Sequence, residues 1–205
     1  QTGTSTKIPV FERFERMHPF KMINYLVLSI SGILYAFVFF MFIKHLVFEL
    51  HGDFDFNLPK FFTVSTILLI CSVYFSTRLK KAYQSDDIPL VQNTLSIIFV
   101  SGVLFFISQS IAWMELLQQE VFPKVNDIIP YLFVFSALHL AFVLAGMVMS
   151  VLLFYNYMLI EHDPVKTLIV TTNPTEKIKL ENLMIYWHFN TVAWTVLFLI
   201  FLFIF

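Results

Sequence analysis

Five stretches of this sequence continue for 17 to 33 residues without a charged side chain. They cover residues 22–43, 61–77, 88–114, 128–160 and 182–205. About 20 helical residues are needed to cross the roughly 30 Å hydrocarbon core of a bilayer, and a helix satisfies its own backbone hydrogen bonds where lipid offers no partner. We therefore predict an all-α integral membrane bundle of five transmembrane helices, at approximately 22–43, 59–80, 88–115, 128–160 and 180–205.

The composition and the short connections favour one membrane domain over residues 1–205. Hydrophobic residues make up 58% of the chain and charged residues only 13%, whereas a soluble domain carries about 25% charged residues. With a formal net charge of −1, the composition gives no reason to expect a nucleic-acid partner. The connection at 161–181 is too short to be a domain, and its 171–174 section is typical of a turn-rich loop.

Lysine and arginine are divided unevenly between the two predicted sides of the membrane. Ten lie in the N-terminal segment, the second loop and the fourth loop: Lys7, Arg13, Arg16, Lys21, Arg78, Lys80, Lys81, Lys166, Lys177 and Lys179. Three lie on the other side: Lys44, Lys60 and Lys124. Because cytoplasmic loops carry the excess of basic residues, we predict that the N-terminus is inside and the C-terminus outside. The polar first 21 residues lack the pattern of a cleavable signal peptide, so we expect the first helix to direct insertion.

Four further residues carry local expectations. Pro59, Pro89 and Pro130 fall where the first turns of the second, third and fourth helices are predicted, and proline is tolerated there. Cys71 is the only cysteine, so an internal disulfide cannot form. We expect Cys71 to be a small buried side chain.

Two histidines lie deep in the predicted helices. His139 is about 8 Å to the outer side of the middle of the fourth helix, and His188 about 8 Å to the inner side of the middle of the fifth. A separation of about 16 Å along the membrane normal prevents both from ligating one haem iron. We expect no catalytic residue, cofactor or metal in this chain, and we interpret His139 as a histidine hydrogen-bonded within helix packing.

The last helix carries a polar stripe beside an aromatic one. Glu181 and His188 are two turns apart on one helix face, and Thr195 continues that face. Such a stripe must face protein or water rather than lipid, so it is either a surface that docks on another helix or a proton-entry antenna. Trp187 and Trp194 form the aromatic stripe at the same seven-residue spacing.

The spacing of three sequence features in the last helix resembles that of a known family. Glu181 is followed, after four residues, by the tetrapeptide YWHF that begins at Tyr186, and Trp194 stands five residues further on. This arrangement resembles the final helix of cytochrome c oxidase subunit III, of the haem-copper oxidase superfamily.

The preceding helices support the same resemblance, which covers about residues 57–205. His139 stands seven residues before Gly146, and Gln109 stands six residues before Glu115, as in the family. Gly146 also lies four residues before Ser150, a small-xxx-small spacing that permits close helix contact. The five predicted helices are similar to the shorter bacterial form of subunit III.

Four positions depart from the family pattern. The membrane glutamate of the family's second retained helix has no clear counterpart, and Ser85 stands nearest to its place. Phe142 stands where the family often has a second histidine, Thr191 where it often has an aspartate, and Ser31 where the five-helix forms usually have an acidic residue. These departures argue against proton conduction by this subunit itself.

The resemblance implies an accessory, non-redox subunit of a respiratory oxidase in the bacterial cytoplasmic membrane. Haems and copper would belong to partner subunits, with oxygen reduced in the catalytic subunit I beside subunit II. Subunit III would hold phospholipid and support assembly and proton uptake during aerobic respiration. The sequence leaves open whether the oxidase joins a larger respiratory supercomplex.

Other functions remain open. A quinol oxidase of the same superfamily also uses a five-helix subunit III, so helix count leaves the electron donor open. A self-contained membrane haem protein would need histidines at matching depth. A small-molecule transporter would show paired broken helices in two halves.

Overall fold

The structure is a computed structural model and describes residues 17–48, 58–118, 129–160 and 164–204. In chain order the elements are α2 (Pro19–Phe48), α3 (Lys60–Ser76), α4 (Arg78–Gln84), α5 (Ile88–Gln118), α6 (Ile129–Met158), α7 (Pro164–Thr172) and α8 (Pro174–Ile204). This described part contains no strand, and five of its segments are long and apolar enough to cross a membrane, with α3 and α4 together forming one of them. The predicted all-α bundle of five transmembrane helices is confirmed.

The helix ends differ from those predicted from the charge-free runs. The first helix begins at Pro19 rather than residue 22 and continues past Lys44 to Phe48. A lysine near a helix end can keep its ammonium group in the headgroup region, so a charge need not end the helix. The second span runs on to Gln84, the third to Gln118, and the fourth is slightly shorter than predicted.

The turn-rich loop predicted at 171–174 is wrong. Helix α7 extends to Thr172, and only Asn173 separates it from α8. The side-chain oxygen of Asn173 accepts a hydrogen bond of 2.9 Å from the backbone N–H of Thr175. An asparagine cap followed by a proline in the first turn begins a helix, so α8 starts well before the predicted residue 180.

Two of the three prolines lie in the first turn of a helix as predicted, and Pro59 lies one residue before its helix. Pro89 and Pro130 are the second residues of α5 and α6. At these positions the missing N–H has no intrahelical acceptor to lose.

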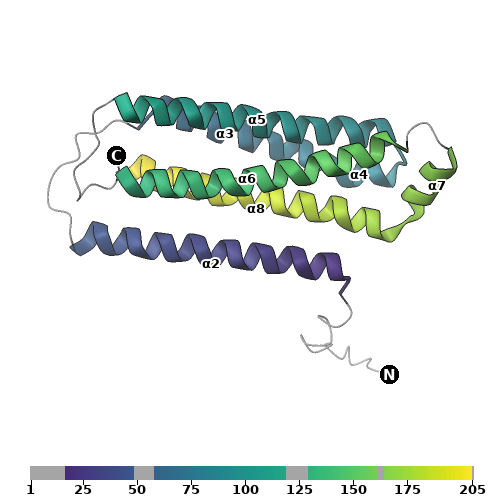
Figure 1. Cartoon of the computed structure of the whole chain (residues 1–205), viewed down its shortest axis with the longest axis horizontal. Coiled ribbons are helices and arrows are strands. Elements are labelled where there is room, and N and C mark those ends of the chain that lie inside the picture. The colour runs from purple at the N-terminus through teal and green to yellow at the C-terminus, as the bar shows by residue number, and fades with distance from the viewer. Residues whose placement is uncertain (1–16, 49–57, 119–128, 161–163, 205) are drawn as a thin grey trace, which may run out of the picture.

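The spans form three tiers (Figure 1). Helices α3 and α5 lie together on one side, α6 and α8 form the middle tier, and α2 lies on the opposite side. In an apolar stretch of 18 residues of α2, only 17% of the residues are buried. The share in the corresponding stretches of the other spans is 33 to 44%. Helix α2 is therefore a peripheral helix held against α8 and α6.

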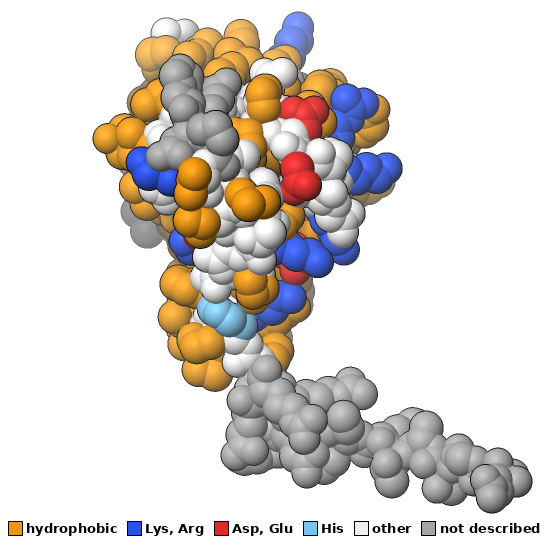
Figure 2. Space-filling model, turned by 90° about the vertical axis from the view of Figure 1, so that its right-hand side faces the viewer, with side chains coloured by type: hydrophobic (Ala, Val, Ile, Leu, Met, Phe, Trp, Pro, Cys, Tyr) orange, Lys and Arg blue, Asp and Glu red, His pale blue; other side chains and the backbone are white. Residues whose placement is uncertain are grey.

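The predicted division of basic residues has a spatial counterpart. The start of α2, helix α4, helix α7 and the start of α8 lie at one end of the bundle (Figure 1). Lysine and arginine side chains gather on that end when it faces the viewer (Figure 2). The described basic residues of these elements are Lys21, Arg78, Lys80, Lys81, Lys166, Lys177 and Lys179. That this end faces the cytoplasm stays a prediction.

Candidate functional site

Four of the five serine and threonine side chains of α3 lie inside the bundle, and the fifth, Thr63, is exposed. Ser65, Thr66, Ser72 and Ser76 are all buried. Each donates its hydroxyl hydrogen to a carbonyl three or four residues earlier in α3, at 2.6 to 2.8 Å. The hydrogens are thus used within the helix, and the oxygens remain able to accept hydrogen bonds from other helices.

Two tryptophans of α8 use these acceptors. Trp187 Nε1 donates to Ser72 Oγ at 2.7 Å, and Trp194 Nε1 donates to Thr66 Oγ1 at 2.9 Å. An indole N–H needs a partner when it is buried, and each tryptophan side chain is almost completely buried. The predicted aromatic stripe is therefore a set of cross-helix contacts between α8 and α3.

Polar side chains of α5 and α8 also bond to the hydroxyl oxygens of α3. Gln109 Nε2 donates to Ser65 Oγ at 2.8 Å, joining α5 to α3. Nε2 of His188 lies 3.1 Å from Ser76 Oγ. Because the hydrogen of Ser76 is already used, the imidazole of His188 is the donor. Trp113, the remaining tryptophan, donates to a serine hydroxyl of α6 in the same way, at 2.9 Å.

Trp187 occupies a space that two glycines leave open. A Cβ atom on Gly146 would lie 3.1 Å from the Trp187 ring and 3.2 Å from the Tyr186 ring. A Cβ atom on Gly102 would lie 3.4 Å from Trp187 and only 2.5 Å from Cγ of Met147. The Tyr186 hydroxyl donates to the Phe142 carbonyl at 2.9 Å. Gly146 and the first two residues of YWHF, which belong to separate parts of the family pattern, are thus in direct contact.

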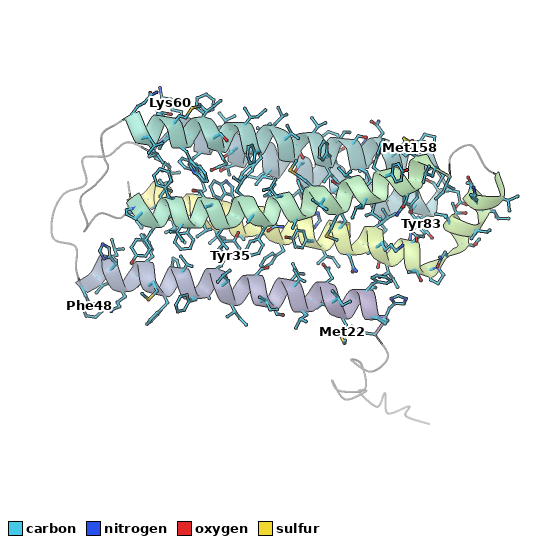
Figure 3. The ribbon with its side chains drawn as sticks, viewed as in Figure 1. Met22, Tyr35, Phe48, Lys60, Tyr83 and Met158 are labelled. Atoms are coloured by element: carbon cyan, nitrogen blue, oxygen red, sulfur yellow. The ribbon has the colours of Figure 1, made fainter. Side chains whose placement is uncertain are left out.

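His139 is completely buried at a point where all five spans meet. The Tyr35 hydroxyl of α2 lies 2.8 Å from its Nδ1, and Tyr35 points from α2 toward the middle tier (Figure 3). The His139 ring stacks on Trp194, with 4.9 Å between centroids, and meets the Phe105 ring edge-on at 5.3 Å. With Thr66 bonded to Trp194, these five residues draw one side chain from each span. We call Tyr35, Thr66, Phe105, His139 and Trp194 the His139 layer.

The predicted polar stripe divides between two helices. Glu181 forms an ion pair of 3.1 Å with Lys21 of α2, while His188 contacts α3. Thr195 donates to the carbonyl of Thr191 within α8. The stripe therefore docks on helices of the same chain, as one of its two interpretations required, while its role as a proton-entry antenna stays a prediction.

His188 also lines a shallow groove between α3 and α8. The groove encloses about 350 Å³, and its other walls include Ile70, Val73 and Val196. Val196 also lines a second groove of about 260 Å³, between α8 and α2, beside Tyr35. The surfaces of both grooves are almost entirely apolar.

Two sequence expectations need correction. Cys71 is exposed rather than buried. Helix α3 buries the face whose hydroxyl oxygens accept hydrogen bonds from α5 and α8, and this turns Cys71 outward. His139 packs on Trp194, six residues after His188 in α8, so the two histidines are about 9 Å apart along the helix axis rather than 16 Å. The larger distance assumed that the two runs have their middles at one depth, but α8 begins well before its run.

The positions of His139 and His188 decide whether the two can bind one metal ion. The His139 ring lies against Trp194, which bonds Thr66, whereas His188 bonds Ser76, ten residues and about 15 Å further along α3. Bonds from histidine to a metal are about 2 Å long, so one ion cannot reach both imidazoles. Among the described residues, no three histidine, cysteine, aspartate or glutamate side chains are grouped as metal ligands. Glu115 lies half-buried nearly two turns beyond Gln109 in α5 and is not brought into the His139 layer.

Searches of the sequence against protein-family models and against curated proteins find no match. The site is therefore described by its own contacts. Sequence reasoning missed the hydroxyl face of α3 and missed Tyr35. A signal was present for the former, because Ser65, Ser72 and Ser76 are spaced by seven and four residues on one face of an apolar helix.

Proposed function

We propose that this chain is the accessory, non-redox subunit III of a haem-copper terminal oxidase. It would lie beside the catalytic subunit I and subunit II in a bacterial cytoplasmic membrane. Its task would be to support assembly, lipid binding and proton uptake by the catalytic subunit, which carries the haems and copper.

One observation carries this proposal. The residues that resemble the subunit III pattern come from separate helices, yet they meet in two contacts. Gly146 seats the Tyr186 and Trp187 rings, and His139 stacks on Trp194. A coincidental match of short motifs has no reason to place residues of separate motifs against each other, whereas a packing signature requires it.

Three of the positions that depart from the family pattern support an accessory role. Thr191 donates to the carbonyl of Trp187, and Ser31 donates to the carbonyl of Val27. Phe142 packs against the Tyr35 ring at 5.4 Å between centroids. These three residues pack or bond locally and offer no ionisable group for proton transfer. The apolar grooves between α3 and α8 and between α8 and α2 would accommodate acyl chains of the expected phospholipid.

Purification of the tagged chain from its native membrane in mild detergent tests the proposal. We expect co-purifying subunits I and II by mass spectrometry and a reduced haem a- or o-type band in the optical spectrum. The haem type and the partners would also separate a cytochrome c oxidase from a quinol oxidase and reveal any supercomplex. A haem spectrum from the chain expressed alone, or partners typical of a transporter, would overturn the proposal.

Two variants sharpen this experiment. His188→Ala and Glu181→Ala should reduce the amount of this subunit retained in the complex more than they change the haem spectrum. Cys71→Ser is the control, because Cys71 is exposed on the outer face of α3. Unchanged subunit content with a shifted haem spectrum would contradict an accessory role.

A further inference from the structure

Two buried polar atoms, one in the His139 layer and one on the neighbouring helix α5, have no hydrogen-bond partner. They are Nε2 of His139 and Oε1 of Gln109. Both side chains are fully buried, and each is held at its other polar atom. A buried polar atom without a partner costs about 1 to 3 kcal/mol, so such atoms call for an explanation.

The hydrogen-bond network assigns the proton on His139. The Tyr35 hydroxyl is buried, and its hydrogen-bond partner is Nδ1 of His139. If Nδ1 carried the proton, the Tyr35 hydrogen would be left without an acceptor. Tyr35 therefore donates to Nδ1, and the neutral imidazole carries its own hydrogen on Nε2. The atom without a partner is a donor.

The orientation of Gln109 is assigned in the same way. The Ser65 hydroxyl hydrogen is used by the carbonyl of Phe62, so Ser65 Oγ must accept. The group of Gln109 that faces Ser65 is therefore the NH₂ group, at 2.8 Å. This leaves Oε1, which is an acceptor, without a partner.

The two residues lie at one level of the bundle. The close approach of Gly102 to Met147 and the bond from Trp113 to Ser136 define the antiparallel register of α5 and α6. Between these contacts, Gln109 is level with the residue next to His139. The two imidazole nitrogens point in nearly opposite directions, and Nδ1 faces α2. Nε2 is therefore directed to the other side of the middle tier, where α3 and α5 lie (Figure 1).

We propose that a buried water molecule accepts a hydrogen bond from His139 Nε2–H and donates one to Gln109 Oε1. A direct bond between the two groups is absent, whereas a water molecule supplies both the acceptor and the donor that they need. The water would link α6, which Tyr35 joins to α2, with α5, which Ser65 joins to α3. This site is independent of the proposed function, because it follows from the hydrogen-bond partners of these side chains alone.

Solid-state NMR of the full chain in lipid bilayers, with ¹⁵N-labelled histidine, tests this site. We expect His139 to be protonated on Nε2 and that proton to show magnetisation transfer from water. His139→Phe identifies the signal. The spectrum of the unaltered protein can overturn the proposal without any variant, because an Nδ1–H tautomer, or an Nε2–H signal without transfer from water, would contradict it.

A near-isosteric variant provides the second measurement. Gln109→Met keeps the side-chain length but removes the amide, so the water contact of His139 should be lost. His188, whose Nε2–H is bonded to Ser76 in another part of the bundle, is the internal control and should keep its signal. A water contact of His139 that persists unchanged in Gln109→Met would show that Gln109 is not a partner and would overturn the bridge.

Discussion

Helices α2 and α5 have nearly the same length, 30 and 31 residues, but they are held in different ways. Helix α5 buries twelve residues between Ile88 and Leu116, most of them apolar. Helix α2 buries five along one narrow stripe, and these are Asn24, Ser31, Tyr35, Phe42 and His45. Four of the five carry a polar group. Apolar packing therefore accounts for most of what α5 buries, whereas polar groups make up the larger share of what α2 buries.

The difference between the two helices follows from the lipid that surrounds them. Lipid is as apolar as a leucine side chain, so the hydrophobic effect does not distinguish a helix–helix contact from a helix–lipid contact. Dense packing against glycines supplies dispersion attraction in the core. A peripheral helix has fewer such contacts, and polar bonds then specify where it docks. Substitutions in the two regions should separate these two modes, with stability measured throughout by unfolding of the protein in bilayers or mixed micelles.

The largest effect is expected in the core, at Gly146. Gly146→Leu would force the Tyr186 and Trp187 rings away from α6, and overpacking of this kind costs about 3 kcal/mol. Gly32 of α2 is the matched control, because a Cβ there meets only Phe189, at 4.0 Å. Gly32→Leu should cost less than about 1 kcal/mol. Equal losses at the two glycines would contradict the proposed contrast.

The next effect is expected at Trp194. Trp194→Phe removes the bond to Thr66 and part of the ring that stacks on His139, for an expected loss of about 2 kcal/mol. A double-mutant cycle with Thr66→Val isolates the hydrogen bond, whose share should be below about 1.7 kcal/mol. If the free energy of unfolding is unchanged in Trp194→Phe, the His139 layer does not stabilise the core.

A smaller effect is expected where α2 meets the core. Tyr35→Phe deletes the hydroxyl that bonds His139, with an expected loss of about 1 kcal/mol. The loss should concern α2 selectively, so hydrogen exchange should increase in α2 more than in α5. Uniform acceleration over both helices would mean that Tyr35 supports the whole bundle instead.

The smallest effect is expected at the ion pair of Lys21 and Glu181. Both side chains are partly exposed, so Lys21→Met should cost about 0.5 kcal/mol, and added salt should reduce the difference from the unaltered protein. The charge-reversed pair, Lys21→Glu with Glu181→Lys, should recover most of the loss. The hydrogen bond of 2.8 Å from Asn182 to the Phe20 carbonyl holds the same end of α2 and remains in every variant.

Prediction from sequence succeeded for features that depend on the bilayer and failed for features that depend on neighbours. The five spans, the first-turn prolines and the gathering of basic residues at one end were predictable, because each follows from what lipid and its interface accept. The exposure of Cys71 was predicted wrongly, since an apolar run does not reveal which of its faces meets lipid. The 171–174 segment was also predicted wrongly, because Asn173 and Pro174 begin a helix as readily as they form a turn.

For the candidate site, the sequence supplied residues but not their partners. His139, Gln109, Trp187 and Trp194 could be singled out because polar and amphipathic side chains in an apolar helix need a reason to be there. The sequence by itself determined how many helices cross the membrane, because backbone groups in lipid must be satisfied within each helix. Only the tertiary structure decided that α3 would provide the hydroxyl acceptors and that five spans would meet at His139. A side-chain donor can be satisfied by any acceptor within reach, and reach is set by how the helices pack.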